Sequence, residues 1–184
     1  MITPTPIEEQ ICRILTQITE DLYVQQIKTD GPWTKMIKER LGQFGHILGF
    51  KTCTSGFKDE HDKEWLYDLV WYQEDEEHLL IDLPLAVESE WNMDVAQIKY
   101  DFEKLLAVRA GHRLMICQCR TKYKQDRLEY FRKAVKAYRY RLAGDRYLIA
   151  LLDLMDASFH FELIVLAEPD TVETLSIEIP EEAT

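Results

Sequence analysis

The segment from residue 85 to residue 106 constrains the fold most strongly, because it joins an apolar strand pattern directly to an amphipathic helix pattern. Glu88 and Glu90 stand two residues apart in the strand part, so their side chains point to the same face of a sheet. Two like charges in an apolar strand are costly to bury unless a cation lies between them. The sequence therefore predicts a divalent metal ion or a basic partner beside these two carboxylates.

The helix pattern that follows rests on apolar residues at helical spacing, namely Val95, Ile98, Phe102, Leu105 and Leu106. This spacing predicts a helix over residues 94–109, with Lys99 and Lys104 outside the apolar stripe. Upstream, residues 65–72 (WLYDLVWY) are typical of a strand, and Asp68 is the one carboxylate among their aromatic and branched side chains.

The order of elements along the chain is predicted as α, α, β, β, β, α, β, α, β, β. The predicted helices cover about residues 7–28, 33–44, 94–109 and 124–142, and the predicted strands 47–54, 65–72, 79–91 with a bulge at Pro84, 112–119, 147–154 and 159–167. Strands that alternate with helices indicate parallel pairing, whereas the short link after the second strand indicates a hairpin. We therefore expect an α/β fold in which helices cover a mixed sheet.

A single domain is expected over residues 1–167, because a chain of 184 residues is long enough for one substantial core. Residues 168–184 carry six acidic side chains, two prolines and no basic residue, which favours a partly disordered acidic tail.

Charge is distributed unevenly along the chain. Residues 120–146 hold ten Lys and Arg against three acidic residues, a local charge of +7, so the remainder of this −11 chain carries −18. The apolar stripe of the predicted helix leaves four cations for solvent: Arg127, Lys133, Lys136 and Arg141. Such a face fits a phosphate backbone, because cations there release counterions. A plain solvated helix face is the alternative, since helix surfaces are routinely rich in Lys and Arg.

Composition favours a soluble, cytoplasmic protein without a membrane partner. Hydrophobic residues make up 46% of the chain, no apolar run approaches the roughly 18 residues of a membrane span, and no basic segment precedes the first apolar residues. Four cysteines lack CxxC spacing, which favours buried thiols over zinc ligands. A homo-oligomer is compatible with these features.

With Asp68 on one strand and Glu88 and Glu90 on the next, the sequence resembles the PD-(D/E)XK nuclease superfamily, which has the restriction-endonuclease-like fold. The core of that fold runs helix, three strands, helix, strand, and the resemblance covers about residues 33–119. Asp68 stands where the family's motif Asp lies, and Glu88 begins the (D/E)xK motif, whose lysine is replaced here by Glu90. Some members use ExE, and others take the lysine from the following helix, where Lys104 in DFEKLL is our choice.

The resemblance implies an αβββαβ core with an added N-terminal helix and C-terminal strands, and a magnesium-dependent nuclease. Asp68 and Glu88 would hold Mg²⁺ or Mn²⁺, which needs few carboxylates besides waters and phosphate oxygens. Glu90 would orient or deprotonate the attacking water, and Lys104 or Lys99 would stabilise the developing charge.

Each candidate also has an ordinary structural interpretation. Asp68 could be an ion-paired carboxylate, Glu88 and Glu90 could face solvent, and Lys104 could be a surface lysine. Glu39 on the second helix is a further candidate ligand, with an exposed helix glutamate as its alternative. The alternative function is a catalytically inactive member of the fold that serves as a protein interaction module, which the charge of −11 and the missing strand lysine favour.

Overall fold

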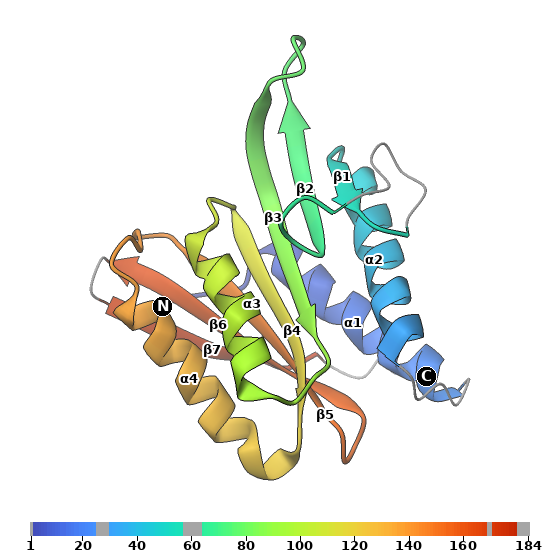
Figure 1. Cartoon of the computed structure of the whole chain (residues 1–184), viewed down its shortest axis with the longest axis vertical. Coiled ribbons are helices and arrows are strands. Elements are labelled where there is room, and N and C mark those ends of the chain that lie inside the picture. The colour runs from blue at the N-terminus through green and yellow to red at the C-terminus, as the bar shows by residue number, and fades with distance from the viewer. Residues whose placement is uncertain (1, 25–29, 57–63, 169–170, 180–184) are drawn as a thin grey trace.

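The fold is one mixed sheet with helices on both faces, as Figure 1 shows. The computed structural model describes residues 2–24, 30–56, 64–168 and 171–179. In these ranges the helices are α1 (Pro6–Val24), α2 (Asp30–Ile47), α3 (Val95–Ala107) and α4 (Lys124–Ala137), preceded by a 3-10 turn at Thr121–Tyr123. The strands are β1 (Lys51–Thr54), β2 (Leu69–Glu74), β3 (Leu80–Glu90), β4 (His112–Cys119), β5 (Arg146–Asp153), β6 (Ser158–Glu168) and β7 (Thr171–Ile177).

The strands follow one another in space in their chain order, β1 to β7. β3–β4 and β4–β5 pair in parallel, and the other neighbours are antiparallel. β4 and β5 are buried along almost their whole length, so they lack the polar alternation of a half-exposed strand. One core layer lies between the sheet and α3 and α4, and the other lies between the sheet and α1 and α2.

The structure confirms the α/β class, the mixed sheet and the helices on both faces. It also confirms that the strand after Asp68 is the antiparallel neighbour of β3, while β4 runs parallel to β3. The bulge expected at Pro84 is present, because the register steps from Trp71 opposite Leu85 to Gln73 opposite Asp82.

Several element boundaries differ from the expectation. β2 begins at Leu69 instead of residue 65, so Asp68 lies just before the strand and not within it. α2 begins at Asp30 instead of residue 33, since proline is tolerated in the first turn of a helix. α4 ends at Ala137, because the backbone of Tyr138 is extended (φ −68°, ψ 120°), and Leu142 is consequently 51% exposed outside any helical stripe. The predicted end of the first helix at residues 25–28 lies outside the described residues.

The segment expected to be an acidic tail contains a strand. β7 pairs antiparallel with β6 over seven residue pairs and forms the far edge of the sheet. Val172 packs against the core on the α3 and α4 side, and Ile177 against the core on the other side. These alternating apolar contacts hold the strand despite its acidic composition, so the expectation of a tail is wrong for this part. Residues 169–170 and 180–184 lie outside the described residues.

α1 is anchored at its first turn by Glu8, which is 1% exposed. Thr5 and Glu8 form a reciprocal capping box: Glu8 N donates to Thr5 Oγ1 (3.2 Å), and Thr5 N donates to Glu8 Oε2 (2.8 Å). The same carboxylate accepts two hydrogen bonds from Arg146 at the start of β5, at 2.7 and 2.8 Å. One side chain therefore both starts the helix and ties it to the sheet.

The β2–β3 hairpin projects beyond the rest of the sheet (Figure 1). Its tip exposes three consecutive apolar side chains, Leu79, Leu80 and Ile81, next to the acidic residues 74–77. None of the helices in the described ranges has a stretch long and apolar enough to cross a bilayer.

Gly45 is required where α2 crosses β2. A Cβ at this position would lie 2.6 Å from Nε1 of the fully buried Trp71, whose indole donates to Leu41 O. We expect Gly45→Ala to lower the free energy of unfolding by about 1–3 kcal/mol, the usual cost of overpacking a core. Urea unfolding followed by Trp fluorescence measures this.

The matched control is Gly31→Ala in the first turn of the same helix, where a Cβ meets nothing within 4 Å. It should leave stability unchanged or raise it slightly, because alanine has the higher helix propensity. Equal stability of the two variants would contradict the assigned contact between Gly45 and Trp71.

Candidate functional site

The candidate site lies at the carboxyl end of β3, where Asp68 is fixed by the neighbouring strand. Asp68 immediately precedes β2, and the antiparallel register that places Leu69 opposite Val87 brings Asp68 beside Ser89. Asp68 Oδ2 accepts hydrogen bonds from Ser89 N and Ser89 Oγ, both at 2.7 Å. Among the described residues, Asp68 Oδ1 accepts no hydrogen bond, and it lies 3.9 Å from Lys38 Nζ.

Glu88 lies beneath α3. Its neighbour two residues earlier, Ala86, belongs to the core layer on the α3 and α4 side, so strand alternation places Glu88 on that face. The residue is only 2% exposed. Lys104 reaches it from α3, with Nζ 2.5 Å from Glu88 Oε1 and 3.3 Å from Asp101 Oδ1. The lysine ammonium also lies about 6 Å from the ring centres of Tyr67 and Tyr100.

Burial controls the protonation of this pair. It raises the pKa of Glu88 from 4.5 to about 8, opposed by Lys104 and reinforced by the negative charge of Asp68. Burial acts to lower the pKa of Lys104, but Glu88 and Asp101 outweigh it and raise that pKa. The site thus holds a carboxyl group that resists ionisation beside an ammonium that resists deprotonation.

A second lysine, Lys38, approaches from α2 and was not predicted from the sequence. It is buried, and its Nζ lies 2.5 Å from Glu64 Oε1, 3.2 Å from Ser55 Oγ and 3.9 Å from Asp68 Oδ1. The available signal was its position beside Ile37 and three residues before Leu41, on the buried stripe of α2. The carboxylates of the site are therefore flanked by lysines from two helices.

Three other candidates lie away from the Glu88–Lys104 pair. Glu90 Oε1 accepts a hydrogen bond from Asn92 N at 2.5 Å, so it caps the loop after β3. Lys99 and Glu39 each form an exposed ion pair within their own helix, Lys99 with Glu103 and Glu39 with Lys35. Of the two lysines considered on the helix after β3, the structure brings Lys104 to Glu88.

The donor set fits a sparse site for a hard cation. Within the described ranges, no group of three or more His, Cys, Asp or Glu side chains is placed to hold a metal ion. Asp68 Oδ1 and Glu88, once Glu88 has lost its proton, supply two hard oxygen donors, which is the number that Mg²⁺ commonly takes from a protein. The cysteines are free and buried, as expected, and burial raises the pKa of the Cys117 thiol to about 12.

The basic surface is smaller than expected. Arg127 is 8% exposed and donates to Met93 O at 3.4 Å, so the expectation that it faces solvent is wrong. It precedes the core residue Leu128 and points toward α3. Lys133 and Lys136 are exposed on α4, and Arg141 lies beyond the helix end with Nη1 donating to Tyr138 O at 2.9 Å.

The shifted pKa of Glu88 predicts a pH dependence of stability. Because burial raises the pKa of Glu88 in the folded state to about 8, folding favours the protonated form. The stability that this gives is present below the ordinary pKa of 4.5 and is lost as the pH rises toward 8. Replacing Glu88 by Gln removes the titration. We expect the wild type to lose stability relative to Glu88→Gln between about pH 5 and pH 8, measured by urea unfolding.

The control for this measurement is Glu90→Gln, which removes a partly exposed carboxylate at the end of the same strand. That variant should keep the pH dependence of the wild type. Parallel profiles for the wild type and Glu88→Gln would contradict the buried, proton-holding carboxyl group.

The chain was compared with family models, curated proteins and solved structures, and it shows no significant match to any of them.

Proposed function

We propose that the protein is a magnesium-dependent nuclease of the PD-(D/E)XK type, with Asp68, Glu88 and Lys104 at its centre. The observation that carries this proposal is the contact of Lys104 Nζ with Glu88 Oε1 at 2.5 Å, beside a carboxylate fixed by Ser89. A second support is the order α2, β1, β2, β3, α3, β4, which is the helix, three strands, helix, strand order of the restriction-endonuclease-like core.

The proposed chemistry divides between the metal and the chain. Bound Mg²⁺ or Mn²⁺ would polarise the scissile phosphate and lower the pKa of a coordinated water. Asp68 and Glu88 are the residues that would hold it. Lys104, which keeps its proton, would stabilise negative charge on the phosphate, and Lys38 would hold Asp68 in place from the other side.

A second candidate function is a protein interaction module built on an inactive site. Its support is that the carboxylates of the site already have partners within the chain. Glu88 forms an ion pair with Lys104, and Glu90 accepts a hydrogen bond from the loop after β3. The net charge of −11 also slows the approach to a polyanion. Metal binding and cleavage separate the two functions.

The nuclease proposal predicts that divalent cations stabilise the folded protein. About 10 mM Mg²⁺ or Mn²⁺ should raise the melting temperature, because only the native state assembles the two carboxylates. Asp68→Asn and Glu88→Gln should each abolish the rise, whereas Glu39→Gln should retain it, since Glu39 pairs with Lys35 on the exposed face of α2. Thermal melts followed by circular dichroism measure the shift.

Cleavage of a fluorescently labelled oligonucleotide with Mn²⁺ completes this test. Lys104→Met should abolish cleavage while retaining the metal-induced rise in melting temperature. A wild type that shows neither a shift nor cleavage would leave the interaction module as the better assignment.

Nucleic-acid binding should depend on the exposed cations of α4. The double variant Lys133→Ala/Lys136→Ala should weaken binding and lower the slope of log affinity against log salt by about one unit for each lysine that pairs with a phosphate in the wild type. Fluorescence anisotropy with single-stranded and duplex DNA and RNA measures the slope.

The control variant Arg13→Ala/Lys35→Ala loses the same number of positive charges, here from α1 and α2 on the opposite face of the sheet. This control should keep the salt slope of the wild type. Equal slopes for the two double variants would show that charge alone, and not the surface of α4, governs binding.

A further inference from the structure

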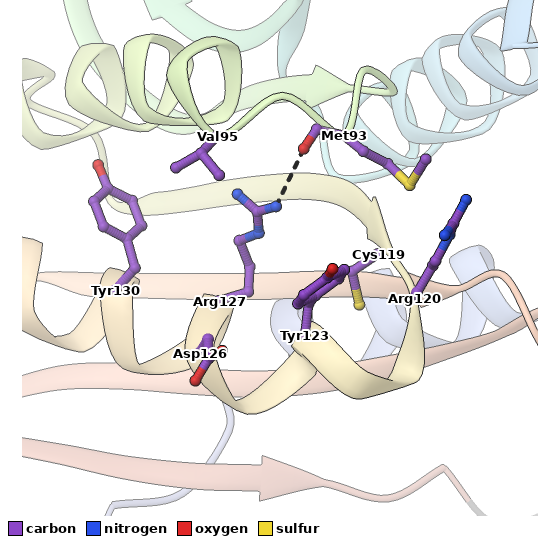
Figure 2. Close-up of a pocket in the computed structure, with 8 residues that line it drawn as sticks. All are labelled: Met93, Val95, Cys119, Arg120, Tyr123, Asp126, Arg127 and Tyr130. Atoms are coloured by element: carbon purple, nitrogen blue, oxygen red, sulfur yellow. Dashed lines mark hydrogen bonds between the residues drawn. The ribbon is translucent and has the colours of Figure 1, made fainter.

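A pocket of about 450 Å³ lies between α3, the end of β4 and α4 (Figure 2). It shares no lining residue with the pair formed by Glu88 and Lys104. Its walls are mainly apolar, with contributions from Met93, Val95, Cys119, Tyr123 and Tyr130. This volume and this lining are typical of sites for small molecules.

Arg127 is the buried charged residue of the pocket lining, and within the described residues it forms no ion pair. The other charged residues of the lining, Arg120 and Asp126, are exposed. Figure 2 shows its side chain rising from α4 toward Met93, while the carboxylate of Asp126 points away. The guanidinium carries five N–H donors, and the one hydrogen bond that it makes to a described residue is the 3.4 Å contact with Met93 O. No carboxylate in the described part of the chain forms an ion pair with Arg127.

An arginine that is 8% exposed and has no counter-ion among the described residues is energetically unusual. Buried charges are normally paired, because the loss of hydration is otherwise uncompensated. The neighbouring ion pairs follow this rule: Arg132 on the next turn of α4 meets Glu162, and Arg113 meets Asp145. Arg127 departs from it at the wall of a cavity.

Tyr130 supplies a second group without a partner at the same pocket. Its hydroxyl is buried and makes no hydrogen bond within the described residues. A buried hydroxyl is normally hydrogen-bonded, and each exception calls for an explanation such as an absent ligand. Arg127 and Tyr130 stand three residues apart on α4, so they lie on the same side of the helix.

We propose that this pocket binds a small organic monoanion, a carboxylate attached to an apolar aromatic or aliphatic body. Arg127 pairs with the carboxylate through parallel N–H donors, and the Tyr130 hydroxyl donates to it. The apolar walls take the body of the ligand. One buried cation neutralises one negative charge, which favours a carboxylate over a phosphate monoester. Exposed Arg120 at the rim attracts the anion from solution.

Binding of phenylbutyrate, compared with its neutral analogue phenylbutanol, tests the proposal by calorimetry on the full chain. The carboxylate should bind the wild type at least about tenfold more tightly than the alcohol, and Arg127→Met should remove this preference. Arg109→Met, which removes an exposed cation between α3 and β4, should bind like the wild type. Tyr130→Phe should weaken the carboxylate several-fold.

Thermal melts separate a binding role of Arg127 from a structural one. Phenylbutyrate should raise the melting temperature of the wild type and not that of Arg127→Met. Without ligand, Arg127→Met should melt no lower than the wild type, because it removes an uncompensated buried charge. A large loss of stability in this variant, with no effect of phenylbutyrate on the wild type, would overturn the proposal.

A second variant keeps Arg127 intact. Val95→Trp places a bulky ring at the half-exposed mouth of the pocket and should abolish phenylbutyrate binding without lowering the melting temperature. Unchanged binding in Val95→Trp would overturn the assignment to this pocket. Tighter binding of adenosine monophosphate than of phenylbutyrate would overturn the class of ligand.

Discussion

Burial of the central parallel strands on both faces is the constraint on which the rest of the structure depends. Helices cover β4 and β5 from either side, so a glutamate that is buried against these layers is stabilised by a cation from another element. Three buried carboxylates show how this is done, each with its own cation: Glu8 of α1 with Arg146 of β5, Glu162 of β6 with Arg132 of α4, and Glu88 of β3 with Lys104 of α3. Three helices are thereby fixed to the sheet by charge as well as by apolar packing.

These three ion pairs are not chemically equivalent. Glu8 and Glu162 each receive two N–H donors from a planar guanidinium, so both of their oxygens are occupied. Glu88 meets a single ammonium, a point charge that cannot bracket both oxygens. The Lys104 side chain is also 29% exposed, so solvent reaches the lysine although it does not reach the buried Glu88 carboxylate. Of the three ion pairs, the one between Glu88 and Lys104 is therefore the best suited to hold a reactive group.

The order of elements as far as β6 followed from the sequence, because helical spacing and the short hairpin link are local signals. Lys104 was chosen through the family resemblance, whereas helical spacing placed it outside the apolar stripe. The strand β7 did not follow from the sequence. Its acidic composition indicated a tail, and its apolar side chains become recognisable as a strand pattern only when it pairs with β6. The buried position of Lys38 was not predicted, and Arg127 was wrongly expected to face solvent, for one shared reason. A cation at the edge of an apolar stripe is ordinarily solvated, and its burial depends on the packing of a second helix or loop against it.

The β2–β3 hairpin extends past the neighbouring strands and leaves Leu79, Leu80 and Ile81 without a covering layer (Figure 1). An uncovered apolar strand end is a template for edge-to-edge association. Here the acidic residues 75–77 lie in the turn, so two such tips would bring like charges together before their leucines could meet. The negative charge of the turn therefore opposes self-association of the apolar hairpin end, and this repulsion weakens as added salt shortens the Debye length.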